Sequence, residues 1–140
     1  MSTRSVIISK MDEGYAGIYC HFDGYVEGVG KTLLQHYQDP GKVKKLIELG
    51  YISSLGERVE PIGDHSLANL EKGTTVAYSR DGGERYDSVS PVVGETFEVV
   101  ADEIVNFATE YIYFFNGEKW FVDGKELAAA VEDAEKENNK

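Results

Sequence analysis

The sequence predicts one α+β domain over residues 1–140, in which a mainly antiparallel sheet packs with about four helices. Three observations support this fold class. Two pairs of β-rich runs are each joined by turn residues, stretches with apolar side chains at helical spacing lie between and after them, and neither a repeat nor a low-complexity linker divides the chain. The sheet is expected to consist of these two β-hairpins and one further strand.

The first predicted hairpin joins a short β-rich run at 6–8 to a second run at 15–22 through turn residues 12–14. Because side chains alternate along a strand, the second run has two distinct faces. One face carries Ile18, Cys20 and Phe22, and the other carries Tyr19 and His21. The first of these faces is expected to pack inward.

A helical hairpin is expected next. Residues 31–38 carry apolar side chains at helical spacing. Asp39 is expected to cap a second helix, with Pro40 at its first position and Gly50 just beyond its end. Glycines and a proline interrupt residues 51–73, which are expected to form a loop with a short helical turn at 65–73.

The second half of the chain adds a strand at 74–80 and a helix that starts near Glu95 or Thr96. The apolar positions of this helix are Phe97, Val100, Ala101, Ile104, Val105 and Ala108. A last helix is expected from Asp123 or Gly124, with residues 136–140 as a frayed polar tail.

The second hairpin has the strongest local signal, because Asn116-Gly117 joins two β-rich runs and is the dipeptide typical of two-residue turns. In the first run, Tyr111, Tyr113 and Phe115 alternate with Ile112 and Phe114. A hairpin that is apolar on both faces needs a packing partner on each face. Either helices cover one face and a partner or second copy covers the other, or the hairpin lies centrally in the sheet. Since interfaces favour tyrosine, we predict that Tyr111 and Tyr113 contact a partner, with a homodimer as one form of it.

The charge of the chain excludes several classes of function. There are 25 acidic and 14 basic residues, a net charge of -11. Direct nucleic-acid binding is not expected, because it takes its affinity from cations that neutralise phosphates. No apolar run is long enough to span a membrane, the N-terminus lacks the features of a signal peptide, and a single cysteine is compatible with a reducing cytoplasm.

Most of the excess negative charge lies in the second half, where residues 71–140 hold sixteen acidic and seven basic residues. Carboxylates spread over regular elements can imitate the phosphates of a duplex and steer a protein toward a basic surface. The predicted contacts are Glu95, Glu98, Asp102, Glu103, Glu132 and Asp133. The alternative is that these acidic faces only keep the protein in solution.

A glycine-rich segment suggests a different kind of site. Gly28, Gly30, Lys31 and Thr32 end like a phosphate-binding P-loop, but Tyr25 stands where that motif requires its first glycine. Nucleotide hydrolysis is therefore not expected. Binding of an anion or a nucleotide phosphate at the N-terminus of the following helix is the alternative hypothesis for this segment.

Metal and thiol chemistry are not expected, and the chain is predicted to use no cofactor. Cys20 and His21 are neighbours on a strand and point to opposite faces, so they cannot share a metal ion. His36 and His65 are distant in sequence, and nothing in their spacing brings either one to Cys20 as a catalytic base. A buried Cys20 would act as a small core residue.

The segment GIYCHFDGYVEGVGKTLLQHYQDPGKVKKLIELGYISSLGE resembles a small family of tailed-bacteriophage proteins of unassigned function. The resemblance covers roughly residues 15–58. It transfers no catalytic residues, but it implies a phage accessory protein that acts in the host cytoplasm. The first hypothesis is therefore a non-enzymatic protein that binds and modulates or inhibits a host factor, such as a defence or nucleic-acid-processing protein. A homo-oligomeric part of the virion is a third hypothesis, after the phosphate-binding domain.

Overall fold

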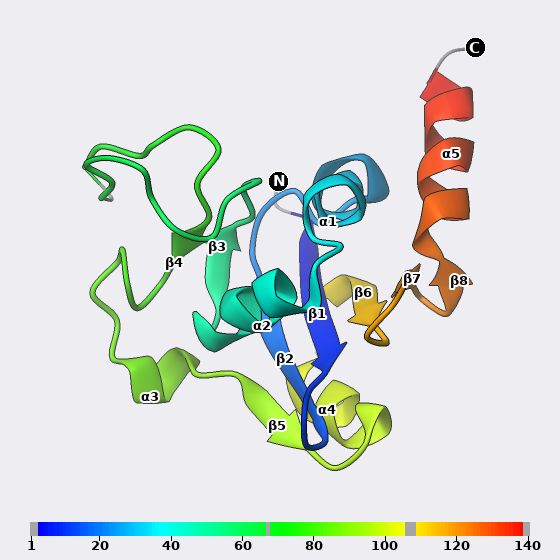
Figure 1. Cartoon of the computed structure of the whole chain (residues 1–140), viewed down its shortest axis with the longest axis horizontal. Helices are drawn as coiled ribbons and strands as arrows, with labels where there is room; N and C mark the ends of the chain where they lie inside the picture. The colour runs from blue at the N-terminus through cyan, green and yellow to red at the C-terminus, as the bar shows by residue number, and fades with distance from the viewer. Residues whose placement is uncertain (1–2, 67, 106–108, 139–140) are drawn as a thin grey trace.

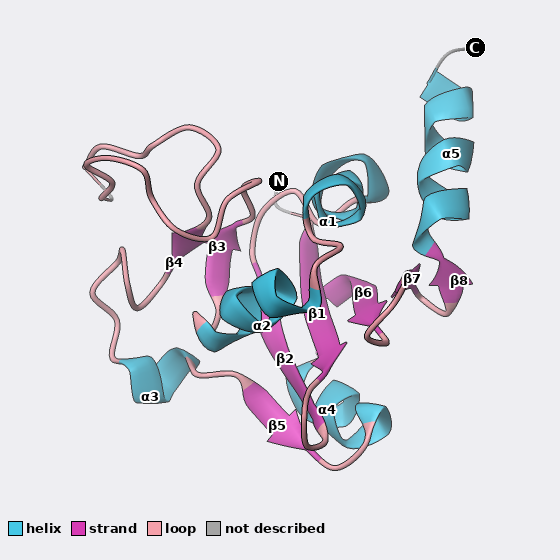
Figure 2. Ribbon diagram, viewed as in Figure 1, coloured by secondary structure: helices cyan, strands magenta, loops and turns pink. Residues whose placement is uncertain are grey.

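The computed structural model describes residues 3–66, 68–105 and 109–138 and has the predicted α+β class (Figures 1 and 2). The helices are α1 Lys31–His36, α2 Pro40–Glu48, α3 Tyr86–Val89, α4 Phe97–Ile104 and α5 Leu127–Asn138, with a π-helical turn, η1, at Val26–Gly30. The strands are β1 Arg4–Lys10, β2 Tyr15–Cys20, β3 Ile52–Ser54, β4 Val76–Ala77, β5 Val92–Gly94, β6 Thr109–Phe115, β7 Trp120–Val122 and β8 Lys125–Glu126. Within the described ranges, no helix has the length and apolar character needed to cross a bilayer.

All the strands belong to one sheet with the order β4-β3-β2-β1-β6-β7-β8, and β5 pairs with β2. Most neighbouring pairs are antiparallel, and both predicted hairpins, β1–β2 and β6–β7, are present. The turn of the second hairpin is shifted by one residue from the prediction. The Asn116 N–H donates to the Lys119 carbonyl, so the central residues are Gly117, with φ +102°, and Glu118.

The parallel pairing of β1 with β6 joins the two halves of the chain and was not predicted. It makes β6 a central strand, which decides between the two alternatives for its apolar faces. Tyr113 and Phe115 pack with α1, α2 and α5, whereas Ile112 and Phe114 pack with α4. Figure 1 shows α2 in front of β1 and β2, and α4 behind them. Helices therefore pack on both faces of the hairpin, with α4 on part of one face.

The predicted ends of helix α2 are confirmed. The Asp39 carboxylate accepts the N–H of Gly41, Pro40 is the first helical residue, and Gly50 follows the helix with φ +83°. Helix α1 ends three residues before the cap residue Asp39 and α2, so two consecutive helices follow each other here as expected.

Several predicted boundaries are wrong. The strand expected at 74–80 is limited to β4, because the Asp81 carboxylate bonds the N–H of Ala77 and the chain turns there. No helical turn is found in the described part of 65–73, where Ser66 and Asn69 form an isolated β-bridge. Helix α4 ends at Ile104, and Ala108 lies outside the described residues. Helix α5 extends to Asn138, residues 139–140 are not described, and the frayed tail stays a prediction.

Candidate functional site

Helix α4 carries the first group of predicted partner contacts, and its position depends on one cap and one glycine. The Thr96 hydroxyl accepts the N–H of Val99 at 3.2 Å, which satisfies one of the free donors at the start of the helix. The helix then packs on β2 at Gly17, where an added Cβ would lie 3.0 Å from Val100 Cγ1. The absence of a side chain at residue 17 therefore allows α4 to approach the sheet closely.

Four acidic side chains on and just before α4 keep their charge available. Glu95, Glu98, Asp102 and Glu103 are all exposed, and none forms an ion pair with a described residue. The sequence correctly placed these residues on one helix and its N-terminal turn. Their negative field is consequently not neutralised by the protein itself.

The two predicted contacts on α5 are different, because each is paired with a lysine. Glu132 pairs with Lys136 at 3.3 Å, and Asp133 pairs with Lys125 at 2.6 Å. The hydrogen bond from Lys125 is the main reason why the pKa of Asp133 lies below its ordinary value. Helix α5 also lies at one end of the molecule, away from α4 (Figure 1). The structure therefore does not bring Glu132 and Asp133 together with the α4 carboxylates.

An apolar groove of about 750 Å³ opens between the start of α4 and the β6–β7 hairpin. We call it the aromatic groove, and its apolar lining consists of Tyr15, Phe97, Ile112, Phe114 and Phe121. The rings form a connected set, with Phe114 in contact with its three aromatic neighbours at centroid distances of 4.9 to 6.4 Å. The carboxylates of Glu95, Glu98 and Asp123 also line the wall, and no Lys or Arg of the described residues does.

Asp123 has a structural role as well. Its Oδ1 accepts the N–H of Ile112 at 3.0 Å, and its own N–H donates to the Ile112 carbonyl at 2.9 Å. These two hydrogen bonds hold the end of β7 against β6. Sequence reasoning placed Asp123 only at the start of a helix and missed the aromatic groove, because its walls come from four segments that sequence alone does not bring together.

The two predicted tyrosine contacts are not equivalent. Tyr113 is completely buried and its hydroxyl donates to the Gly24 carbonyl at 2.6 Å, so its assignment to a partner-binding surface is wrong. Tyr111 is half-buried and stacks on Tyr113 at a ring distance of 6.2 Å. Both lie on the face opposite α4, where burial raises the pKa of Tyr113 well above its ordinary value.

The glycine-rich segment uses its own backbone donors within the chain. The Gly28 N–H donates to Tyr25, the Val29 N–H donates to Asp23, and the Lys31 N–H points to the Gly28 and Val26 carbonyls. The Thr32 hydroxyl also donates to the Gly28 carbonyl, at 3.0 Å. An anion at this turn would therefore have to compete with bonds that are already formed.

The remaining parts of the predicted phosphate site also have structural partners. Lys31 pairs with Glu135 of α5 at 3.1 Å. A Cβ at residue 30 would lie 3.2 Å from both Leu127 and Tyr113, so Gly30 provides room for α5 and β6. The anion-binding hypothesis for Gly28, Gly30, Lys31 and Thr32 stays a prediction that none of these contacts favours.

Cys20 is fully buried, and burial raises the pKa of its thiol to about 12. The thiol is therefore protonated at neutral pH and a poor nucleophile.

Two other candidate residues, His21 and His36, have partners within the chain. The Tyr19 hydroxyl and His21 Nδ1 share a hydrogen bond of 2.8 Å, and His36 Nε2 lies 3.7 Å from the Glu57 carboxylate. In the described part of the chain, no three His, Cys, Asp or Glu side chains gather where they could hold a metal ion.

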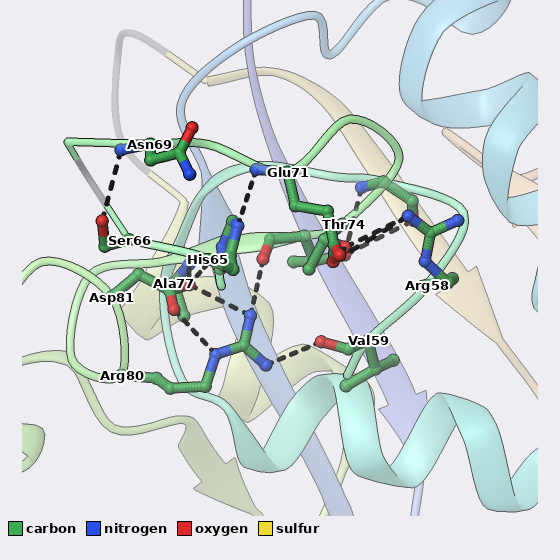
Figure 3. Close-up of polar contacts among 12 residues, drawn as sticks. Arg58, Val59, His65, Ser66, Asn69, Glu71, Thr74, Ala77, Arg80 and Asp81 are labelled. Atoms are coloured by element: carbon green, nitrogen blue, oxygen red, sulfur yellow. Dashed lines mark hydrogen bonds and ion pairs between the residues drawn. The ribbon is translucent and has the colours of Figure 1, made fainter. Parts of the chain in front are cut away.

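A polar cluster that sequence reasoning missed organises the loop over 57–81 (Figure 3). The Glu71 carboxylate accepts the Thr74 hydroxyl and the N–H groups of Ile62 and Gly63. The Thr74 hydrogen bond is the largest cause that lowers the pKa of Glu71 to about 2. Arg80 donates to the carbonyls of Val59 and Thr75, both at 2.6 Å.

His65 joins this loop cluster from the inside. Its Nδ1 accepts the N–H of Glu71 at 3.0 Å, and its Nε2 lies 3.3 Å from Asp81 Oδ2 without the orientation of a hydrogen bond. With one ring nitrogen occupied by a backbone donor and the other facing Asp81, His65 fastens the loop and has no nitrogen directed to solvent. We interpret the cluster as structural.

Comparisons with known proteins found no matching family model, curated protein or solved structure.

Proposed function

We propose that the chain is a non-enzymatic binding module whose α4 carboxylates and aromatic groove hold a positively charged segment of a partner protein. The observation that supports this most directly is the composition of the groove wall. Glu95 and Glu98 flank a connected set of aromatic rings. Within the described ranges, no Lys or Arg lines the groove and neither carboxylate has an ion-pair partner.

The chemistry of the groove favours arginine and lysine side chains. Their aliphatic stems bury well against apolar surface, and their charged heads interact with both carboxylates and aromatic faces. Aromatic residues in such a setting commonly dominate the binding energy of an interface. The unpaired α4 carboxylates add steering over the Debye length of about 8 Å at physiological salt.

The resemblance to phage proteins makes a host protein the expected partner. A defence or nucleic-acid-processing enzyme has basic surfaces that normally meet phosphates, and carboxylates presented on α4 compete for such a surface. The proposed effect is modulation or inhibition of that enzyme by occupation of its basic surface. We give the α5 carboxylates no part in this contact, because lysines already neutralise them.

Site-specific photo-crosslinking tests the proposal. A photoreactive phenylalanine derivative is placed at position 98 of the full chain, and the matched control carries it at position 132 on α5. Both proteins are irradiated in bacterial lysate at moderate salt, and the crosslinked peptides are identified by mass spectrometry. We expect adducts from position 98 alone, with the crosslinked partner segment carrying a net positive charge.

Three outcomes would contradict the proposal. Equal yields from positions 98 and 132 would show that adduct formation does not depend on the α4 face. Crosslinks from position 98 to a second copy of the chain would indicate a homodimer, and crosslinks to neutral or acidic segments would remove the electrostatic basis. Recovery of the protein in purified virions would instead favour the hypothesis that it is a homo-oligomeric part of the virion.

A further inference from the structure

A second hollow, of about 580 Å³, lies at the other end of α4. Its wall contains three tyrosine rings, Tyr19, Tyr51 and Tyr78, together with the carboxylates of Glu84 and Glu103. We call it the tyrosine pocket. It shares no lining residue with the aromatic groove.

The backbone around the tyrosine pocket fixes the position of its rings. The Tyr51 N–H donates to the Val89 carbonyl at 2.7 Å, and the Tyr78 N–H donates to the Tyr51 carbonyl at 3.2 Å. Gly50 makes the first of these contacts feasible, because its φ is +83° and a Cβ there would lie 2.4 Å from the Val89 oxygen. Strand β2 supplies Tyr19, whose ring lies 5.8 Å from that of Tyr51. The rings are thus held by separate, hydrogen-bonded segments.

The three tyrosines are neutral at physiological pH. Burial is the largest cause that raises the pKa of Tyr19, Tyr51 and Tyr78 above the ordinary value, and Glu103 raises that of Tyr51 further. The Tyr19 hydroxyl bonds His21, whereas the hydroxyls of Tyr51 and Tyr78 have no hydrogen-bond partner among the described residues. Neutral phenol rings present electron-rich faces, which attract cations.

The charges at the tyrosine pocket are mainly negative. Glu84 and Glu103 are exposed. Among the residues that the structure describes, neither has an ion-pair partner, and no Lys or Arg belongs to the lining. Arg4 is not among the lining residues, but its positive charge opposes the rise of the pKa of Tyr19 and Tyr78. Two carboxylates and three rings outweigh this single positive charge.

We infer that the tyrosine pocket binds a compact organic cation, an ammonium or guanidinium group. Aromatic rings combined with carboxylates are the usual protein environment for such groups, and the volume lies within the range of roughly 300 to 1,000 Å³ that is typical of small-molecule sites. The cation comes either from a free small molecule or from a lysine or arginine side chain of a protein. The site does not depend on the function proposed for the aromatic groove.

Nuclear magnetic resonance of the tyrosine rings tests this inference on the full chain. Tetramethylammonium chloride is added at constant ionic strength, and tert-butyl alcohol serves as the uncharged ligand of the same shape. We expect saturable shifts of the Tyr19, Tyr51 and Tyr78 resonances, with a Kd of roughly millimolar size, for the cation alone. Equal shifts with tert-butyl alcohol, or no saturation at any soluble concentration, would overturn the inference.

Four variants locate the binding within the pocket. Glu103→Gln is expected to raise the Kd about threefold to tenfold, and Arg4→Gln to lower it about twofold, because each changes one charge near the ligand. Glu98→Gln, at the other end of α4, is the matched control and is expected to leave the Kd unchanged. Tyr78→Leu is expected to abolish saturation. If that variant fails to fold, as its amide spectrum will show, Glu103→Gln decides the result, and an unchanged Kd would contradict the inference.

A comparison of ligands separates the two sources of the cation. Capped arginine amide and capped citrulline amide have the same shape but differ in charge. Stronger binding of the arginine amide than of tetramethylammonium identifies a protein side chain as the source, and the reverse order identifies a free ammonium compound. Equal binding of the arginine and citrulline amides, without binding of tetramethylammonium, would contradict the proposed cation site.

Discussion

At the scale of single residues, Glu71 shows how one carboxylate can hold a long loop. It accepts three hydrogen bonds from Ile62, Gly63 and Thr74, and these lower its pKa from the ordinary 4.5 to about 2. Because the folded-state pKa is the lower one, ionised Glu71 contributes stability above about pH 4.5, and this contribution is lost as the pH falls toward about 2.

Glu71→Gln is therefore expected to lower the Tm at neutral pH, and the difference from the natural protein should shrink between about pH 4.5 and pH 2. Thermal unfolding over this pH range provides the measurement. Glu60→Gln is the control, because Glu60 is exposed in the same loop. A deficit for Glu71→Gln that stays constant over the whole pH range would show that ionisation of Glu71 does not stabilise the loop.

Gly17 provides a second residue-scale prediction. An added methyl group would lie 3.0 Å from both Val100 Cγ1 and Ile8 Cγ1, so Gly17→Ala should push α4 from the sheet and lower the unfolding free energy by roughly 1 to 3 kcal/mol. Gly63→Ala has ordinary space around its new methyl group and should change stability by less than about 0.5 kcal/mol. Urea denaturation compares the two. Equal effects would contradict the close packing of α4 on Gly17.

At the scale of elements, the sequence predicted those features that neighbouring residues determine. Asp39-Pro40 and Gly50 bound α2, Thr96 starts α4, and turn residues join both hairpins. It did not predict the parallel pairing of β1 with β6, because the partners are about a hundred residues apart and a parallel pair leaves no turn signal between its strands. Strands β3, β5 and β8 have three residues or fewer, which is too short to show alternation.

The same limit applies to the candidate site. The α4 carboxylates could be predicted, because helical spacing places them on one element. The aromatic groove could not, since Tyr15, Phe97 and Phe121 come from three segments that only the sheet order brings together. Tyr113 was assigned to a surface for a related reason: alternation shows that a strand has two apolar faces but not which neighbours cover them.

Helix α4 is short, with eight residues, so its cap should matter. Thr96→Ala is expected to cost about 1 kcal/mol of stability, because it removes the acceptor for the Val99 N–H. Thr96→Ser keeps this hydroxyl and should stay within about 0.5 kcal/mol of the natural protein. Denaturant unfolding followed by circular dichroism measures both variants. A loss of the same size in Thr96→Ser would show that the methyl group matters and not the cap.

At the scale of the whole molecule, the net charge of -11 is distributed in two ways. Lysines pair with three carboxylates of α5, whereas the four on and just before α4 remain unpaired among the described residues, and three of these four line the two hollows. This contrast is the basis of the proposal that the α4 face binds a positively charged partner segment. The α4 carboxylates are thus available to an external cation, whereas Glu132 and Asp133 already have lysine partners.

Binding of a fluorescent peptide rich in arginine, lysine and leucine, at physiological salt, tests this central claim most directly. The double variants Glu95→Gln/Glu98→Gln and Glu132→Gln/Asp133→Asn remove the same amount of charge from α4 and from α5. If the α4 face is the binding surface, the first variant should weaken binding about tenfold or more, and the second by less than about twofold. Equal weakening by both variants would show that net charge alone attracts the peptide and would contradict a specific site on α4.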